Sequence, residues 1–152
     1  MKLIAHRGNI NGQNTELENK PEYILETISL GYDCEIDVRY VNDTLYLGHD
    51  LPQYEISINF LLSNSHKLWI HCKNMDALDF LIKYKDLNIF WHENDTYTIT
   101  SKQYIWSYVG AQTTKNIICV MPELQSQNIV TNNNSFFGIC TDQCLKYQNI
   151  SS

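Results

Sequence analysis

The chain has 152 residues, of which 43% are hydrophobic and 18% charged. This length and composition are typical of one domain, spanning residues 1–152, and they exclude a chain that is disordered throughout. The formal net charge of −6 excludes the broadly basic surface that nucleic-acid binding requires, so a phosphate-bearing ligand would need a local cation.

Targeting and cysteine signals are weak. No run of about 18 apolar residues is present, which argues against an integral membrane segment, and the start MKLIAHRG lacks the apolar region of a secretory signal. The five cysteines are an odd number, and Cys140 and Cys144 have no second pair at zinc-ligand spacing. We therefore expect a cytoplasmic protein with reduced, structural thiols.

Short segments rich in Tyr, Trp, Ile, Val and Cys recur along the chain and are typical of β-strands. In chain order they are LIAH (3–6), CEIDVRY (34–40), TLYLGH (44–49), KLWIHCK (67–73), NIFWHE (88–93), YIWSYV (104–109), NIICVM (116–121) and FGICT (137–141).

Helices are predicted between some of these strands. The first has Asn19 as its N-cap, Pro21 in its first turn and Gly31 after its last turn, which are all helix-boundary signals. Another follows Asn74, and a third shows a weaker apolar pattern. The three predicted helices span residues 20–30, 56–64 and 75–85.

Strands that alternate with helices indicate parallel βα units and an α/β fold. A complete barrel takes about 200 to 250 residues, so we expect a compact or shortened TIM-type (β/α) barrel of about seven to eight mainly parallel strands with few full helices. An open doubly wound sheet is the alternative, although the chain has no glycine-rich phosphate loop. A shortened barrel would expose apolar strand surface, which predicts a homodimer.

Polar side chains gather at or near the strand ends of the first half. Glu35 and Asp37 stand two apart in one strand and share a face, as do His71 and Lys73 in another. His6 ends the first strand, at the carboxyl edge where α/β sites are built. Neighbouring carboxylates repel unless a cation neutralises them, so Glu35 and Asp37 predict a divalent metal site, with Mg²⁺ or Ca²⁺ first.

A series of motifs resembles the N-terminal signature of the glycerophosphodiester phosphodiesterase family. The chain carries, in this order, His6-Arg7-Gly8, Glu18-Asn19, Glu35-Ile36-Asp37-Val38 and His49-Asp50. The likeness is specific over the first fifty residues. It is looser over residues 68–73 and 138–142, where His71-Cys72-Lys73 and Gly138-Ile139-Cys140-Thr141-Asp142 stand in the place of the family's later strands.

The resemblance implies a compact barrel and metal-assisted hydrolysis of a glycerophosphodiester or a similar small, lipid-derived phosphodiester. His6 and His49 would be the general acid/base pair, since an imidazole with a pKa of about 6.5 exchanges protons near neutral pH. Arg7 would hold the non-bridging phosphate oxygens, and Lys73 would add a second positive charge.

By the same resemblance, Glu35 and Asp37 would ligate the metal. His71 stands where the family carries a glutamate, and an imidazole ligand would shift the preference toward Mn²⁺ or Zn²⁺. Other residues that can complete the shell are His92, Glu93 and Glu123.

Three residues are predicted on the substrate side: Glu18, Trp106 and Glu123. Glu18 would lie near the site through its motif. Trp106 belongs to an alternating aromatic pattern that predicts either core filling or a wall against a ligand.

Three other functions are compatible with this sequence. A lyase related to the sphingomyelinase D type would use the same two histidines and release a cyclic phosphate. A degenerate barrel would bind a phosphorylated ligand without turnover. A purely structural domain is the third, although such a domain has no physical need for two acid/base histidines.

Overall fold

The structure is a computed structural model that describes residues 1–108, 114–124 and 136–148. Its strands are β1 (Lys2–His6), β2 (Asp33–Val41), β3 (Thr44–Leu47), β4 (Tyr54–Ile56), β5 (Leu68–Cys72), β6 (Ile89–Phe90), β7 (Tyr97–Ile99), β8 (Ile105–Ser107), β9 (Ile117–Val120) and β10 (Gly138–Thr141). Its helices are α1 (Pro21–Ser29), α2 (Ile58–Ser63), α3 (Met75–Leu81) and α4 (Cys144–Gln148), with a 3₁₀ turn η1 (Pro122–Leu124).

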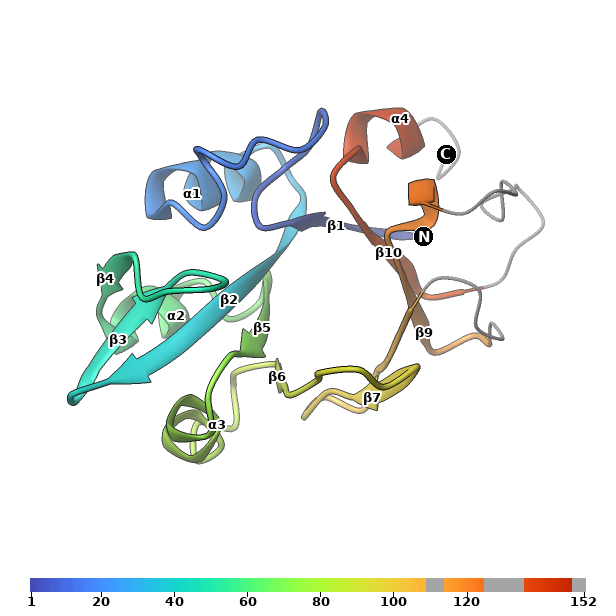
Figure 1. The fold of residues 1–152 in the computed structure, drawn as a ribbon. Coiled ribbons are helices and arrows are strands. Elements are labelled where there is room, and N and C mark those ends of the chain that lie inside the picture. The colour runs from blue at the N-terminus through green and yellow to red at the C-terminus, as the bar shows by residue number, and fades with distance from the viewer. Residues whose placement is uncertain (109–113, 125–135, 149–152) are drawn as a thin grey trace.

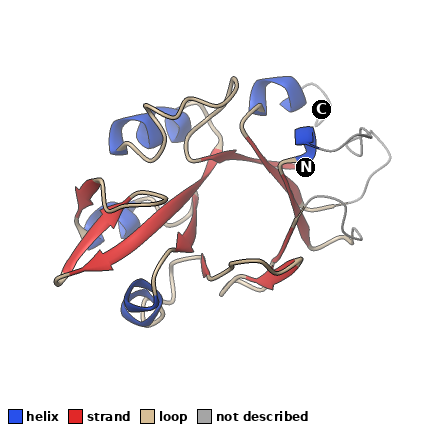
Figure 2. Ribbon diagram, viewed as in Figure 1, coloured by secondary structure: helices blue, strands red, loops and turns tan. Residues whose placement is uncertain are grey.

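All strands belong to one sheet that curls strongly on itself, with the helices outside the curl (Figures 1 and 2). Parallel pairing runs in the order β6-β5-β2-β1-β10-β9-β8. Strands β3, β4 and β7 are attached by antiparallel pairing. Neighbouring parallel strands follow one another in the chain, and the last returns to the first, which is a singly wound order and not the doubly wound alternative.

The two ends of the parallel order are joined by hydrogen bonds outside regular strand pairing. The Ser101 backbone N–H donates to the Ile89 carbonyl at 2.8 Å, and the Ile89 N–H donates to Ser101 Oγ at 2.9 Å. Thr98 Oγ1 donates to the Trp91 carbonyl at 2.8 Å. The segment around β7 therefore covers the edge of β6, which would otherwise carry unpaired backbone groups.

Apolar side chains form separate layers outside and inside the curl. The outer layer packs strand residues such as Ile36 and Ile70 against the helices through Ile24, Leu61 and Leu81. The inner layer consists of strand residues only: Ile4, Trp69, Phe90, Trp106, Ile118, Val120 and Cys140. Since side chains alternate along a strand, the neighbours of Ile36 point into the curl.

The sequence predicted most of these elements. Each of the eight expected strands overlaps an observed one, and the helices form over slightly shorter spans. Strands β4 and β7 were missed because each has only three residues in a polar context. The mixed α/β class and the scarcity of long helices are as predicted; within the described ranges, the only helical element in residues 104–140 is the short 3₁₀ turn η1.

The prediction that Asn19 caps the first helix is wrong. Lys20 occupies the N-cap position of α1 and makes no side-chain cap hydrogen bond. Asn19 adopts a left-handed backbone with φ 62° and directs its side chain to Asp37 instead. Gly31, with φ 98°, follows the helix as expected.

The five cysteines are all buried and unpaired. In the part of the chain that the structure describes, no helix combines the length and apolarity that crossing a bilayer would demand.

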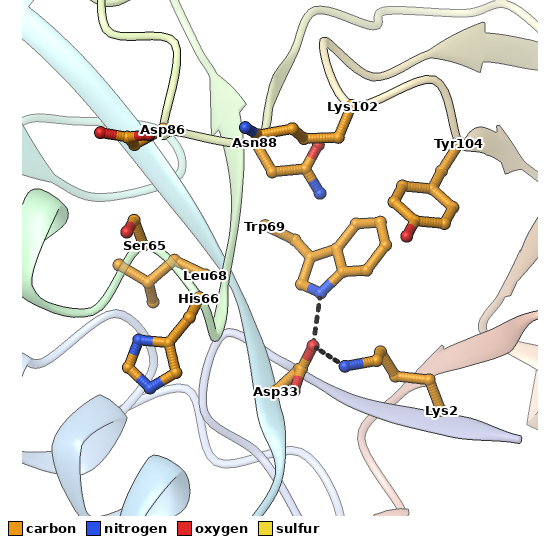
Figure 3. Close-up of a pocket in the computed structure, with 10 residues that line it drawn as sticks. All are labelled: Lys2, Asp33, Ser65, His66, Leu68, Trp69, Asp86, Asn88, Lys102 and Tyr104. Atoms are coloured by element: carbon orange, nitrogen blue, oxygen red, sulfur yellow. Dashed lines mark hydrogen bonds and ion pairs between the residues drawn. The ribbon is translucent and has the colours of Figure 1, made fainter.

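A cavity of about 450 Å³ lies at the amino ends of the strands (Figure 3). The Trp69 indole and the Lys2 ammonium both donate to Asp33 Oδ2, at 3.0 and 2.8 Å. His66 lines the same cavity. Because Asp33 is engaged by its neighbours, this end of the curl is held by a polar cluster.

The core assignment is testable with two leucines. Leu47→Ala, at a fully buried position, should lower the free energy of unfolding by about 2–5 kcal/mol because it leaves a cavity. Leu51→Ala, where the side chain is 68% exposed, should change it by less than about 0.5 kcal/mol. Urea denaturation measures both, and equal losses would contradict the described packing.

Candidate active site

A second cavity, of about 300 Å³, lies at the carboxyl ends of the parallel strands, at the opposite end from the one in Figure 3. The predicted site residues that line it are His6, Arg7, Glu35, His49, His71, Lys73 and Trp106. Its wall also contains His92, Glu93, Tyr108 and Val120. Residues far apart in the sequence therefore meet because each stands at or near the end of a strand.

Glu35, Asp37 and His71 form a group that can hold a metal ion. Each offers one ligand atom, and these atoms lie within 4.8 Å of one another. His71 Nδ1 is 3.5 Å from Asp37 Oδ1 and 3.8 Å from Glu35 Oε1. Asp37 Oδ1 is buried and has no hydrogen-bond partner among the described residues. A buried oxygen left in this way fits a cation as its missing partner.

The tautomer of His71 supports this fit. Its Nε2 lies 3.1 Å from the His92 carbonyl oxygen, which can only accept, so Nε2 carries the proton. Burial lowers the pKa of His71 to about 4, which leaves the ring neutral at pH 7. The lone pair on Nδ1 then faces two carboxylates, an arrangement that a cation between them would stabilise.

The two carboxylates differ in their surroundings. Burial, together with the charge on Asp37, raises the pKa of Glu35. Burial acts on Asp37 in the same direction, but the Arg7 guanidinium and the hydrogen bond from Asn19 outweigh it and lower the pKa of Asp37. Asp37 is therefore the group held as an anion by the protein itself.

Arg7 is held in a left-handed conformation, with φ 53°, directly after β1. Its backbone N–H donates to the Glu35 carbonyl at 2.9 Å. Its guanidinium places Nε 2.9 Å from Asp37 Oδ2 and Nη1 3.1 Å from Glu18 Oε2. Such backbone strain persists where surrounding contacts over-determine it, as they do at ligand sites.

Asn19 completes the fixation of Asp37. Its side-chain amide donates to Asp37 Oδ2 at 2.9 Å, and its carbonyl oxygen accepts from the Asp37 backbone N–H at 3.0 Å. The Asn19 backbone N–H donates to the Arg7 carbonyl at 3.1 Å. The loop between β1 and α1 is thus tied to β2 through both polar atoms of the Asn19 side chain.

His6 is oriented by Asp142, which follows β10. His6 Nδ1 and Asp142 Oδ1 are 2.9 Å apart. Burial disfavours a charged His6, but this hydrogen bond and the charge of Glu35 raise its pKa above 6.5. Asp142 in turn accepts from Asn9 Nδ2 at 2.8 Å. With Nδ1–H given to the carboxylate, Nε2 is the nitrogen left for proton transfer.

His49 stands on a tight loop after β3, and its side chain is about 39% exposed. Its Nδ1 is 2.7 Å from Asp50 Oδ1. Arg39 donates to the backbone carbonyls of Gly48 and His49, and these two hydrogen bonds fix the loop. Gly48 has φ 148°, and a Cβ at this position would collide with the Leu51 carbonyl, so only glycine fits.

Lys73 and the aromatic residues complete the wall. Lys73 Nζ lies 3.9 Å from Asp37 Oδ1. Trp106 is 4% exposed and belongs to the inner layer, so it fills the core and also forms the floor of the cavity. The His92 ring packs on Tyr108 with centroids 4.5 Å apart.

Three predicted site residues do not line this cavity: Asp37, which lies next to Glu35 and His71, and the carboxylates Glu18 and Glu123. Glu18 lies behind it, where its carboxylate binds Arg7 and Asn9. Glu123 accepts from Thr141 Oγ1 at 2.8 Å and from the Asp142 backbone N–H at 3.0 Å. Both carboxylates therefore position other groups of the site.

Sequence reasoning gave no role to Asp142 or Asn9, although Asp142 stood at the end of the GICTD motif. Its position one residue after a strand was the available signal. Asn9 carries no sequence signal, because its partner Asp142 comes from a distant segment. Tyr108 belongs to the same alternating aromatic pattern as Trp106, and it lines the cavity.

Comparison of the chain with protein-family models, with curated proteins and with solved structures finds no match.

Asp142→Asn should lower the pKa of His6, because burial, which disfavours the charged ring, then acts without the Asp142 carboxylate that opposes it. NMR titration of the imidazole in metal-free protein measures this. The charged pair stabilises the fold fully below the unfolded pKa, and that stabilisation is lost as the pH rises through the higher folded pKa. The difference in stability between wild type and variant should therefore shrink as the pH rises. An unchanged His6 pKa would contradict the assigned contact.

Proposed function

We propose that this protein is a metal-dependent phosphodiesterase that hydrolyses a glycerophosphodiester or a similar small phosphodiester. One observation carries the proposal. A single cavity is lined by the two candidate acid/base histidines, His6 and His49, and by Arg7 and Lys73. Glu35 and His71 form its base, with Asp37 directly behind them. This set contains the proton carriers, the phosphate-binding cations and the metal ligands that the reaction needs.

We further propose that the curled sheet is a shortened TIM-type barrel. The singly wound strand order supports this, since β10 pairs with β1 in parallel. The position of the cavity supports it as well, because barrel enzymes build their sites at the carboxyl ends of the strands. Missing crossover helices explain how about seven parallel strands fit into so short a chain.

Phosphate binding follows from the cations at the cavity. The chain as a whole is negative, so the anionic diester must be drawn by Arg7 and Lys73. Two nitrogens of Arg7 face carboxylates, and Nη2 has no hydrogen-bond partner among the described residues. This nitrogen is available for a non-bridging phosphate oxygen.

Glu35, Asp37 and His71 would hold the divalent cation. When bound, it would polarise the phosphate and neutralise charge that develops on the equatorial oxygens. The neutral His71 ring favours Mn²⁺ or Zn²⁺ over Mg²⁺ or Ca²⁺, because imidazole nitrogen is a poor ligand for hard cations.

The two histidines divide the proton transfers. His6, held by Asp142, takes a proton on Nε2 from the attacking water as the water oxygen bonds to phosphorus. His49, at the exposed side of the cavity, gives a proton to the alcohol oxygen as the P–O bond to that oxygen breaks. The products are a phosphomonoester and a free alcohol, and each histidine returns to its starting state by exchange with solvent.

Metal preference can be measured without turnover. In chelator-treated protein, Mn²⁺ or Zn²⁺ at about 100 times its dissociation constant should stabilise the fold by about 2.7 kcal/mol. Mg²⁺ at the same concentration should stabilise it less. His71→Glu should reverse the order, because three carboxylates suit a hard cation. Thermal unfolding and calorimetric titration give both quantities.

Asp37→Asn is the control for this experiment and should remove stabilisation by every cation. If Mg²⁺ stabilises the wild type as strongly as Mn²⁺ does, His71 is not a ligand.

Catalytic roles are tested by histidine replacement. His6→Ala and His49→Ala should each lower kcat for a glycerophosphodiester by about 10²–10⁴-fold, the contribution of one acid or base. His66→Ala serves as the matched control, since His66 lines the cavity at the other end of the strands and should leave kcat unchanged.

Phosphorus NMR of the product separates the rival functions. A ring-opened monoester supports hydrolysis, whereas a stable cyclic phosphate would identify a lyase. Tight binding of a diester without cleavage under any of the four cations would contradict an enzymatic role.

A further inference from the structure

A third cavity, of about 470 Å³, adjoins the candidate active site on the side of His49. Arg7 and His49 line both cavities, so the two adjoin at these side chains. The rest of its wall comes from the loop between β1 and α1 and from the loop between β3 and β4. It has no part in the metal site described above.

Most charged or buried polar groups of this cavity are already engaged. The Glu18 carboxylate accepts from Arg7 on one oxygen and from Asn9 on the other. The Asn19 amide is used by Asp37, and Asp50 pairs with His49. The charges at this wall are therefore balanced locally, and they offer little to a charged ligand.

Uncharged hydrogen-bonding groups remain. The side chains of Gln13, Thr15 and Gln53 line the cavity, and none of them hydrogen-bonds to another described residue. Together they supply two amides and a hydroxyl, that is, both donors and acceptors. Within the described lining, Leu51 is the apolar contribution and no Phe, Tyr or Trp ring is present.

We infer that this third cavity binds the alcohol that leaves during the reaction, and that this alcohol is an uncharged, hydroxylated one such as a polyol or a cyclitol. The inference rests on the proposed function, in which His49 protonates the departing oxygen. That oxygen must lie beside His49, and the remainder of the alcohol then extends into the cavity that His49 also lines.

The lining discriminates between alcohol classes. Several hydroxyl groups match the amides and the hydroxyl, each of which can give and accept a hydrogen bond. A quaternary ammonium alcohol would need an aromatic cage, and an acyl chain would need a continuous apolar wall. The described lining has neither.

Backbone contacts hold the loop that carries Gln53 in one conformation. The Gln53 backbone N–H donates to the Leu47 carbonyl at 3.0 Å. The missing side chain of Gly48 lets the Leu51 carbonyl approach, and Gln53 packs at the same point. A loop held in this way keeps Gln53 and His49 on the wall of one cavity without further ordering on binding.

The test compares two diesters in matched variants. Glycerophosphoinositol has a cyclitol as its leaving alcohol, whereas bis(4-nitrophenyl) phosphate has a leaving group without hydroxyls to bind. Gln53→Met and Thr15→Val keep the shape of the side chain and remove its hydrogen bonding. Each should lower kcat/KM for glycerophosphoinositol about 10-fold, the equivalent of one hydrogen bond of about 1.4 kcal/mol. For bis(4-nitrophenyl) phosphate, kcat/KM should stay unchanged.

Thr15→Ser is the control variant, because it keeps the hydroxyl and should behave as wild type with both diesters. Thermal unfolding verifies that each variant is folded. Equal effects on both diesters, or no effect on either, would overturn the inference and leave the proposed function standing. If the wild type cleaves neither diester, while remaining folded and loaded with Mn²⁺ or Zn²⁺, the proposed function fails and the inference fails with it.

Discussion

Two carboxylates buried side by side, Glu35 and Asp37, impose the constraint on which the rest of the structure depends. Both lie almost completely out of water, and their negative charges repel each other across the inside of the curled sheet. Without compensation such a pair would be strongly destabilising. The surrounding loops supply that compensation through Arg7 and Asn19, both held at positive φ and both bonded to Asp37.

The compensation is incomplete within the protein. Asp37 Oδ1 has no hydrogen bond among the described residues, and the nearest imidazole presents a lone pair, not a proton. If the protein satisfied both carboxylates fully, no uncompensated charge would remain for a ligand to bind. The remaining deficit of positive charge supports the proposed divalent cation at this site, and such a cation would in turn help to hold an anionic diester in a chain of net charge −6.

The curled sheet separates polar from apolar side chains, both between its two faces and between its middle and its ends. Ile36 packs outside against helices, while its neighbours Glu35 and Asp37 point inside. Inside, aromatic side chains such as Trp106 and Trp69 fill the middle layer, so the polar groups are confined to the ends. At one end, Asp33 binds its neighbours in a polar cluster beside a cavity. At the other end lie the two adjoining cavities that share Arg7 and His49.

Local patterns were enough to predict eight of the ten described strands, most helix positions, the shared face of Glu35 and Asp37, and the grouping of His6, His49 and Lys73, because period and strand-end position are properties of neighbouring residues. What only the tertiary structure decided are contacts between distant segments: Asp142 on His6, Asn19 on Asp37 in place of a helix cap, and Glu123 on a backbone in place of a substrate. Such contacts depend on how the sheet curls and returns β10 to β1, and no local sequence pattern encodes that closure.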